Sequence, residues 1–292
     1  METKFILQAI VNGFLLGGVY GLIAIGLTLP FSIMDIPNFA HGEFVMLAMY
    51  ATFFLWRFFG ATPIISIVGV IPLFFLIGVG IYNLILRRLI VTRASTPARL
   101  LALAGLSIFL MNFAMCNWGT KYYILKTSYR MSMIKLGFLI IRIPLLISFI
   151  GSVILTLLLV VFLNKTYTGK ALLATAQNRD SATLMGIDTG LMFTISFGLG
   201  VGLAAGAAPF LTTFTAIFPT VGPSLTLTAF VAVVMGGLGS VKGAYFGGLI
   251  IGMVESVVSL LLTTEWSWIA IFVIFVLILL FRPKGFYGRW VK

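Results

Sequence analysis

The run FILQAIVNGFLLGGVYGLIAIGLTL, residues 5–29, decides the fold class, because 25 consecutive positions carry no charged side chain. A helix needs about 20 apolar residues to cross the roughly 30 Å hydrocarbon core of a bilayer. The run is too long for the apolar core of a signal peptide, and no cleavage site follows it. We therefore predict that it forms the first membrane-spanning helix.

Similar runs recur along the whole chain. Hydrophobic residues make up 61% of the 292 positions and charged residues 9%, whereas soluble domains carry about a quarter of charged residues. The apolar runs lie at residues 5–30, 43–59, 63–86, 99–119, 144–163, 190–213, 224–238, 244–262 and 268–281. The run at 224–238 is short for a full crossing, which favours a broken or re-entrant helix. We predict an all-α polytopic membrane protein with eight or nine transmembrane helices, in a single domain over residues 1–292.

The distribution of basic residues predicts the orientation in the membrane. The chain has 19 Lys and Arg against 7 Asp and Glu. Because the basic residues lie in loops between apolar runs, we expect them to face the membrane surface rather than to bind nucleic acid. One basic group lies at 87–99 and another in the C-terminal tail: Arg87, Arg88, Arg93, Arg99, Arg282, Lys284, Arg289 and Lys292. If both are cytoplasmic, residues 164–190 are cytoplasmic too and the N-terminus lies outside. The loop at 120–143 conflicts with this scheme, because it would be exported with five basic residues and no acid.

Glycine recurs at every fourth position in three stretches. The sets are Gly13, Gly17 and Gly21; Gly198, Gly202 and Gly206; and Gly239, Gly243 and Gly247. A spacing of four places each set on one face of a helix, where two backbones can approach closely. We expect these faces to pack helices together, with pore lining as the alternative.

The sequence lacks the residues that catalysis or cofactor binding would need. Gly169-Lys170 is followed by Ala171, and no Gly-x-x-x-x-Gly-Lys-Ser/Thr motif occurs, so the chain is not expected to bind ATP. One histidine, no cluster of metal ligands and no nucleophile elbow argue against an enzyme and against a metal site. The single cysteine, Cys116, excludes an internal disulfide and is expected to serve packing.

Residues 35–43, with the sequence DIPNFAHGE, are unusually polar for a segment between two apolar runs. Charged groups at membrane depth are costly unless they pair or line a wet cavity. The proline lacks a backbone N–H and Gly42 accepts unusual dihedral angles, so we expect a helix break, with Asn38 capping the next helix. Two interpretations remain: a surface loop in which His41 and Glu43 are solvated, or a buried break that shapes a translocation path.

Glu255 is a single carboxylate in an otherwise apolar run. It either forms a structural hydrogen bond to a neighbouring helix, which we favour, or contacts substrate in a cavity. Asn12, Asn83 and Asn112 have the same two interpretations, hydrogen bonding between helices first and pore lining second.

The loop at about 164–190 predicts two short helices. The first can begin at Thr168 or Gly169, where the following alanines give high helix propensity. Asn178 would turn the chain into the second, which ends near Gly186. The candidate residues of this loop are Thr168, Gly169, Ala171, Ala174, Asn178, Arg179, Gly186 and Ile187. Two half-polar helices between membrane spans indicate either a docking surface for a cytoplasmic partner or a plain connector.

Three groups of residues carry a family resemblance. They are Asn38-Phe39-Ala40-His41-Gly42-Glu43; the loop pattern Gly169, Ala171, Ala174, Asn178, Ala182, Leu184 and Gly186-Ile187; and residues 236–244, GGLGSVKGA, followed by Gly247-Gly248 and Glu255. Together, and in this order, they resemble the Liv-type branched-chain amino acid permeases of ABC transporters, over essentially the whole chain. Leu173 is a departure, because relatives often carry Arg beside the alanines of the loop.

The resemblance implies a multi-pass permease of the bacterial inner membrane with a cytoplasmic C-terminus and no cofactor of its own. Its partners would be a second homologous permease, two cytoplasmic ATPases that bind ATP, and a periplasmic substrate-binding protein, in a setting of membrane lipid. Residues 164–190 would couple to an ATPase. The translocation path or helix break would involve Asn38, His41, Gly42, Glu43 and Glu255. The cargo would be branched-chain or related small amino acids, with urea, short amides or other small acids as alternatives. A stand-alone secondary transporter or channel is the rival interpretation.

Overall fold

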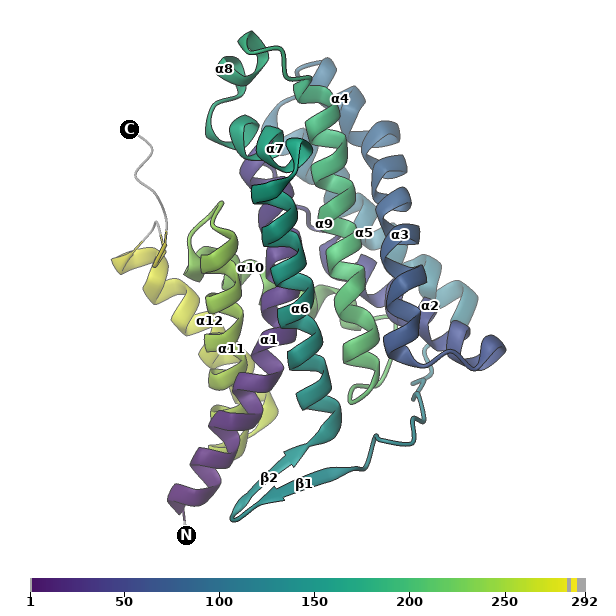
Figure 1. Ribbon diagram of the computed structural model, residues 1–292, viewed down its shortest axis with the longest axis vertical. Coiled ribbons are helices and arrows are strands. Elements are labelled where there is room, and N and C mark those ends of the chain that lie inside the picture. Colours follow the sequence, from purple (N-terminus) through teal and green to yellow (C-terminus); the bar gives the residue numbers. More distant parts are fainter. Residues whose placement is uncertain (1, 283–284, 288–292) are drawn as a thin grey trace.

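The computed structural model describes residues 2–282 and 285–287, as a bundle of long helices with a small β-hairpin at one end (Figure 1). The predicted tail residues Lys284, Arg289 and Lys292 lie outside the described residues. The elements are α1 (Glu2–Met34), α2 (His41–Phe59), α3 (Pro63–Ile81), the π-helical segment η1 (Tyr82–Leu86), α4 (Arg87–Val91), α5 (Thr96–Trp118), β1 (Met133–Leu136), β2 (Leu139–Arg142), α6 (Ile143–Lys165), α7 (Tyr167–Gln177), α8 (Arg179–Leu184), α9 (Thr189–Thr212), α10 (Val221–Gly236), α11 (Val241–Leu261) and α12 (Thr264–Phe281).

Within the described residues, eight helical stretches are long and apolar enough to cross a membrane, and α10 is shorter, with 16 residues. The predicted polytopic α-helical fold is therefore confirmed, including the short segment near residues 224–238. The β-hairpin was not predicted. Its strands pair in antiparallel register, Met133 with Arg142, around a turn in which Gly137 has a φ of +62°. Alternating side chains in four-residue strands are too weak a signal to stand out beside the long apolar runs.

The crossings alternate in direction and sort the connecting segments to two ends of the bundle. In Figure 1, α4, α7 and α8 lie at one end, and the start of α1 and the hairpin lie at the other. The backbone N–H groups of Phe286 and Tyr287 donate to the carbonyls of Met235 and Gly236, at the C-terminal end of α10. The grouping of the connections at the two ends follows the predicted scheme.

The helix contacts fall into two matching sets. Helix α1 packs along α11 as α9 packs along α3, and the bundle is closed where α1 meets α9 and α2 meets α10. Glycine lies against glycine at both meeting points, Gly26 with Gly200 and Gly42 with Gly222. Because α1–α2 and α9–α10 run in opposite directions (Figure 1), the arrangement is that of an inverted repeat, which is frequent in transporters.

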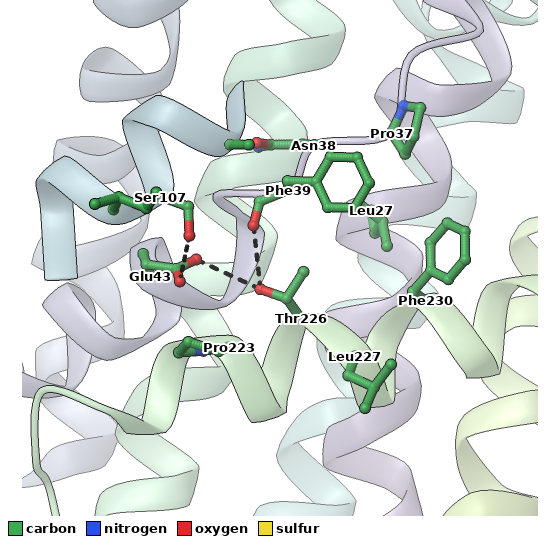
Figure 2. Close-up of a pocket in the computed structure, with 12 residues that line it drawn as sticks. Leu27, Pro37, Asn38, Phe39, Glu43, Ser107, Pro223, Thr226, Leu227 and Phe230 are labelled. Carbon is green, nitrogen blue, oxygen red and sulfur yellow. Dashed lines mark hydrogen bonds between the residues drawn. The ribbon is translucent and has the colours of Figure 1, made fainter. Parts of the chain in front are cut away.

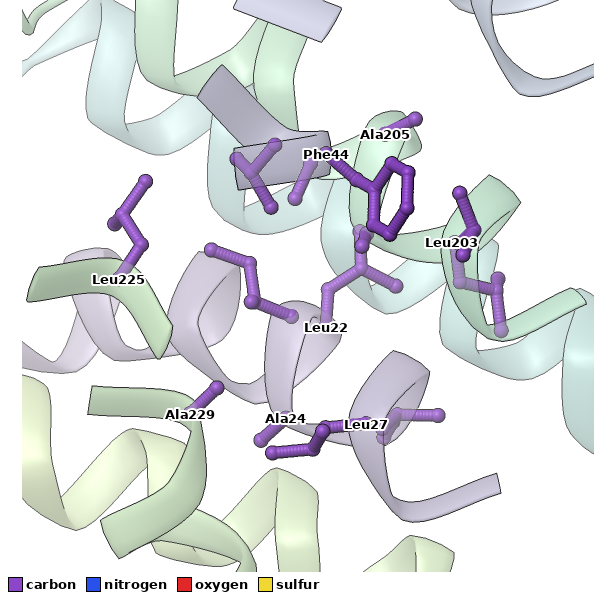
Figure 3. Close-up of a cluster of buried hydrophobic side chains, with 14 of the residues drawn as sticks. Leu22, Ala24, Leu27, Phe44, Leu203, Ala205, Leu225 and Ala229 are labelled. Atoms are coloured by element: carbon purple, nitrogen blue, oxygen red, sulfur yellow. The ribbon is translucent and has the colours of Figure 1, made fainter. Parts of the chain in front are cut away.

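The buried core lies where these four helices meet. Figure 3 shows side chains from all four helices converging there. The labelled ones are Leu22, Ala24 and Leu27 of α1, Phe44 of α2, Leu203 and Ala205 of α9, and Leu225 and Ala229 of α10. This core fixes the place at which α2 and α10 begin.

The glycine sets lie at helix contacts, with one exception. A Cβ on Gly13, Gly17 or Gly21 would collide with α11, one on Gly198, Gly202 or Gly206 would crowd α3, and one on Gly243 or Gly247 would collide with α10. Gly239 is the exception and the prediction that it shares a helix face is wrong. It lies in the turn before α11 with a φ of +85°, because Ser240 caps α11 by accepting a hydrogen bond from the Gly243 N–H (3.1 Å).

Candidate functional site

The polar segment at residues 35–40 leads into the bundle, with Asp35 and Phe39 exposed and Ile36, Asn38 and Ala40 buried. Helix α2 begins at His41, beside α1, and the His41 Nε2 bonds to the Ile23 carbonyl (2.9 Å). Because a carbonyl can only accept, Nε2 must carry the proton. The side chains of His41 and Glu43 are 0% exposed. The surface-loop interpretation is therefore wrong, and the helix break is buried.

Asn38 does not cap α2 in the predicted way. Its Oδ1 accepts from the Ala40 N–H (3.1 Å), two residues further on, and Ala40 occupies the N-cap position without a side-chain bond. This bond to the residue two positions on closes a tight turn before the helix. The predicted cap would instead have accepted from an N–H in the first turn of α2. The Asn38 Nδ2 is buried without a hydrogen-bond partner.

The N-termini of α2 and α10 meet at this break. A Cβ on Gly42 would overlap the Gly222 carbonyl oxygen, so the contact requires glycine. The Gly42 N–H donates to the Thr226 Oγ1 (2.8 Å), which links the first turn of α2 to α10. Both helices direct the positive ends of their dipoles to the same place, which favours a negative group there.

Glu43, in the first turn of α2, is that negative group. Ser107 of α5 donates to its Oε1 (2.7 Å), and Thr226 lies 3.4 Å from its Oε2 (Figure 2). The single proton of Thr226 can go to only one of Glu43, the Gly222 carbonyl (3.2 Å) and the Phe39 carbonyl (3.5 Å). The bond from Ser107 is therefore the firmer one, and Ser107 connects α5 to the break.

These groups border a cavity of about 330 Å³, within the usual range for small-molecule pockets. Figure 2 shows Asn38, Glu43, Ser107 and Thr226 around it, together with the apolar side chains Leu27, Phe39, Leu227 and Phe230. A few polar groups in an apolar wall suit a small ligand that combines an apolar side chain with a polar head. We call this space the break cavity.

The structure brings four of the predicted path residues together and separates the fifth. Asn38, His41, Gly42 and Glu43 meet at the break, whereas Glu255 lines a second cavity with other neighbours. Sequence reasoning missed Ser107 and Thr226. Ser107 is a single hydroxyl in an apolar run, and Thr226 is the middle one of three alternating hydroxyls at residues 224–228, so nothing in the local sequence distinguishes either as a partner of Glu43.

The predicted hydrogen bonds between helices from three asparagines are wrong. Asn83 and Asn112 donate to the carbonyls of Val79 and Ile108, four residues earlier in the same helix, and Asn12 accepts from Gln8. These carbonyls are the nearest acceptors to an asparagine inside a helix. The packing prediction for Cys116 is also wrong, because the residue is exposed.

The loop at 164–190 forms the two short helices that were predicted. Helix α7 begins one residue earlier than expected, at Tyr167, because Thr166 caps it by accepting from the Gly169 N–H (3.0 Å). Asn178 caps α8 by accepting from the Ser181 N–H (2.9 Å), and Gly186 ends the turn with a φ of +81°. Thr168, Ala171, Ala174 and Arg179 lie in the two helices and Ile187 follows them.

Gly169 and Arg179 fix these helices to the bundle. A Cβ on Gly169 would overlap the Phe162 carbonyl and the backbone of α6. The Arg179 guanidinium lies 4.5 Å from the centre of the Phe193 ring of α9, a cation–π contact. Within the described residues, no three His, Cys, Asp or Glu side chains come together as metal ligands would.

An inverted repeat of membrane helices, with helices that begin inside the bundle at a cavity, is the architecture of a membrane transport protein. Residues 9–280 match the family model described as branched-chain amino acid transport system / permease component. The chain belongs to this family, which is one of transport permeases and not of enzymes.

Named relatives agree with the family match. The chain is 31% identical to the high-affinity branched-chain amino acid transport system permease protein LivH of Salmonella typhimurium, over 99% of this chain and 97% of the relative. It is 30% identical to BraD of Pseudomonas aeruginosa, with the same coverage. It is 30% identical to a probable LivH of Methanocaldococcus jannaschii, over 93% and 89% of the two chains. No solved structure gives a significant match.

Proposed function

We propose that this chain is the permease subunit of an ABC importer for branched-chain or related small amino acids. The observation that carries the proposal is the family match over residues 9–280, joined to relatives that are named for branched-chain amino acid transport along nearly their whole length. The chain itself holds no cofactor in this proposal. A second homologous permease, two ATPases that bind ATP and a periplasmic binding protein complete the importer.

The coupling of ATP to transport is assigned to α7 and α8. They stand at one end of the bundle, and Leu184 and Met185 expose 88% and 83% of their surface there. Exposed apolar side chains outside the membrane spans are typical of a protein interface. Because Gly169 and Arg179 join these helices to α6 and α9, a push on them is transmitted to two membrane helices.

The end with α7 and α8 is assigned to the cytoplasm of a bacterial inner membrane. Arg87, Arg88 and Arg93 lie at the same end, as expected from the positive-inside rule. In the basic loop at the other end, residues 120–143, one basic side chain is hydrogen-bonded within the protein: Arg130 donates to the carbonyls of Leu125 (3.0 Å) and Thr212 (3.4 Å). The C-terminus is then cytoplasmic and the N-terminus periplasmic.

Reconstitution tests the proposal. The tagged chain is purified from its native membrane in mild detergent with whatever accompanies it, and placed in liposomes. We expect two ATPases and a second permease to accompany it, and leucine uptake that needs ATP and the binding protein but survives collapse of ion gradients. Competition with isoleucine, valine, urea and acetamide ranks the cargo. Leucine flux by this chain alone, driven by an ion gradient, would overturn the proposal in favour of a secondary transporter.

A further inference from the structure

A second cavity, of about 430 Å³, lies at the end of the bundle that carries the hairpin. It is lined by α1, α2, the end of β2, the start of α6, the end of α9 and its link to α10, the start of α10, α11 and α12. Its wall combines an acid, Glu255, and a base, Arg142, with the aliphatic side chains Leu16, Leu145 and Leu211. We call it the outer cavity.

Glu255 has an incomplete environment. Tyr20 lines the cavity beside it, and the Glu255 Oε2 is buried without a hydrogen-bond partner. A carboxylate in a membrane helix is costly unless a cation or several donors satisfy it. Ser256 and Asn12, which also line the cavity, are neutral. The unpartnered Oε2 can therefore accept a hydrogen bond from a positive group of a ligand in the cavity.

Arg142 is held at the same cavity by the hairpin. Gln8 of α1 forms two hydrogen bonds with the backbone of Ile140, donating to its carbonyl (2.7 Å) and accepting from its N–H (2.7 Å). This pair of bonds fixes β2 to α1 and places Arg142, two residues later, in the cavity wall. The Arg142 guanidinium can therefore bind a carboxylate in the cavity.

We propose that the outer cavity binds a free amino acid as a zwitterion, with its ammonium group at Glu255, its carboxylate at Arg142 and its aliphatic side chain against the leucines. This proposal rests on the proposed function and adds a binding site on the entry side. It also gives the basic loop at 120–143 a purpose that the orientation rule leaves open, because a positive entrance favours the carboxylate of the ligand.

Protection of a cysteine from labelling tests the site. Ser224 lines the cavity and its hydroxyl bonds only within α10, so Ser224→Cys is a small change. The only native cysteine is first removed as Cys116→Ser. The complex in right-side-out vesicles is labelled with a positively charged methanethiosulfonate. We expect millimolar leucine to slow labelling at least threefold, and 4-methylpentanoate or isoamylamine, which lack one charged group each, to slow it less. Lys135→Cys, on the exposed hairpin, should label at one rate throughout.

Charge variants decide which residues bind. Glu255→Gln and Arg142→Gln should each abolish protection by leucine, whereas Glu265→Gln, which changes an exposed charge near the same end, should preserve it. Equal membrane levels and equal Lys135→Cys labelling show that a variant is folded. Protection that survives Glu255→Gln would overturn the proposal.

The same vesicles separate this inference from the proposed function. Leucine uptake without protection of Ser224→Cys would overturn the outer site and keep the importer. Protection by leucine, together with failure of the complex to take up any branched-chain amino acid, would overturn the proposed function and keep the site.

Discussion

Replacing Gly42 by alanine tests whether the close contact of the α2 and α10 N-termini is required. The added Cβ would overlap the Gly222 carbonyl oxygen and lie too close to the backbone nitrogen and hydroxyl of Thr226. Backbone atoms cannot rotate away as a flexible side chain can. The two helices must therefore separate, or α2 must begin later.

The expected cost has two parts. Forcing one extra methyl group into a packed site costs about 1–3 kcal/mol. Separation also breaks the 2.8 Å bond from Gly42 to Thr226, which contributes about 0.5–1.5 kcal/mol. The matched control is Gly80→Ala in α3, where no atom lies within 4 Å of the added Cβ and alanine gains up to about 1 kcal/mol of helix propensity. The two variants should differ by at least about 1.5 kcal/mol.

Equilibrium unfolding in mixed micelles, with increasing denaturing detergent, measures this difference. Gly42→Ala should unfold at lower detergent than the native chain, and Gly80→Ala at the same or higher detergent. Two variants within about 0.5 kcal/mol of each other, the usual range for neutral surface changes, would refute the close contact of α2 and α10.

Three further predictions concern other contacts. Ser107→Ala should lower the free energy of unfolding by about 1–3 kcal/mol, because Glu43 loses its 2.7 Å donor, whereas Thr92→Ala, which removes an exposed hydroxyl, should cost under about 0.5 kcal/mol; equal effects would contradict the role of Ser107. Gly169→Leu should abolish uptake while membrane insertion stays normal, since the side chain would push α7 away from α6; normal uptake would remove α7 from the coupling path. Glu255→Gln should be nearly as stable as the native chain and Glu255→Leu about 1–3 kcal/mol less stable, because the amide keeps a hydrogen-bonding group beside the polar cavity residues Tyr20 and Asn12; equal loss of stability would show that the charge itself is needed.

Features that depend on local sequence were predictable. Long apolar runs predict spanning helices because the bilayer sets their length, and the short run near residues 224–238 predicts a helix that does not cross fully. Asn178 was placed at the start of a short helix, and its side chain caps α8 three residues on. Gly13, Gly17 and Gly21 were expected on one helix face, and all three lie against α11.

Features that depend on distant partners were not predictable. The donors to Glu43 come from positions 64 and 183 residues further along the chain. A serine or threonine in an apolar run looks the same whether it bonds its own helix, as Thr28 does, or another one. The prediction for Gly239 failed for a local reason. The spacing of four residues between glycines extends into the turn before α11, and only the cap at Ser240 shows where the helix begins.

The first turns of α10 stand between the two cavities, and this decides what must move for a ligand to pass. Ser224 and Leu225 line the outer cavity, whereas Thr226 and Leu227 line the break cavity. We therefore expect that a ligand passes from one cavity to the other when this short helix shifts against its neighbours. Spin labels on Leu227→Cys and on Ile108→Cys of α5, in the Cys116→Ser chain, measure the separation of α10 and α5 within the complex. We expect the distance to change when ATP is added. A distance that stays constant through the transport cycle would show that α10 is a fixed wall and that the two cavities belong to separate paths.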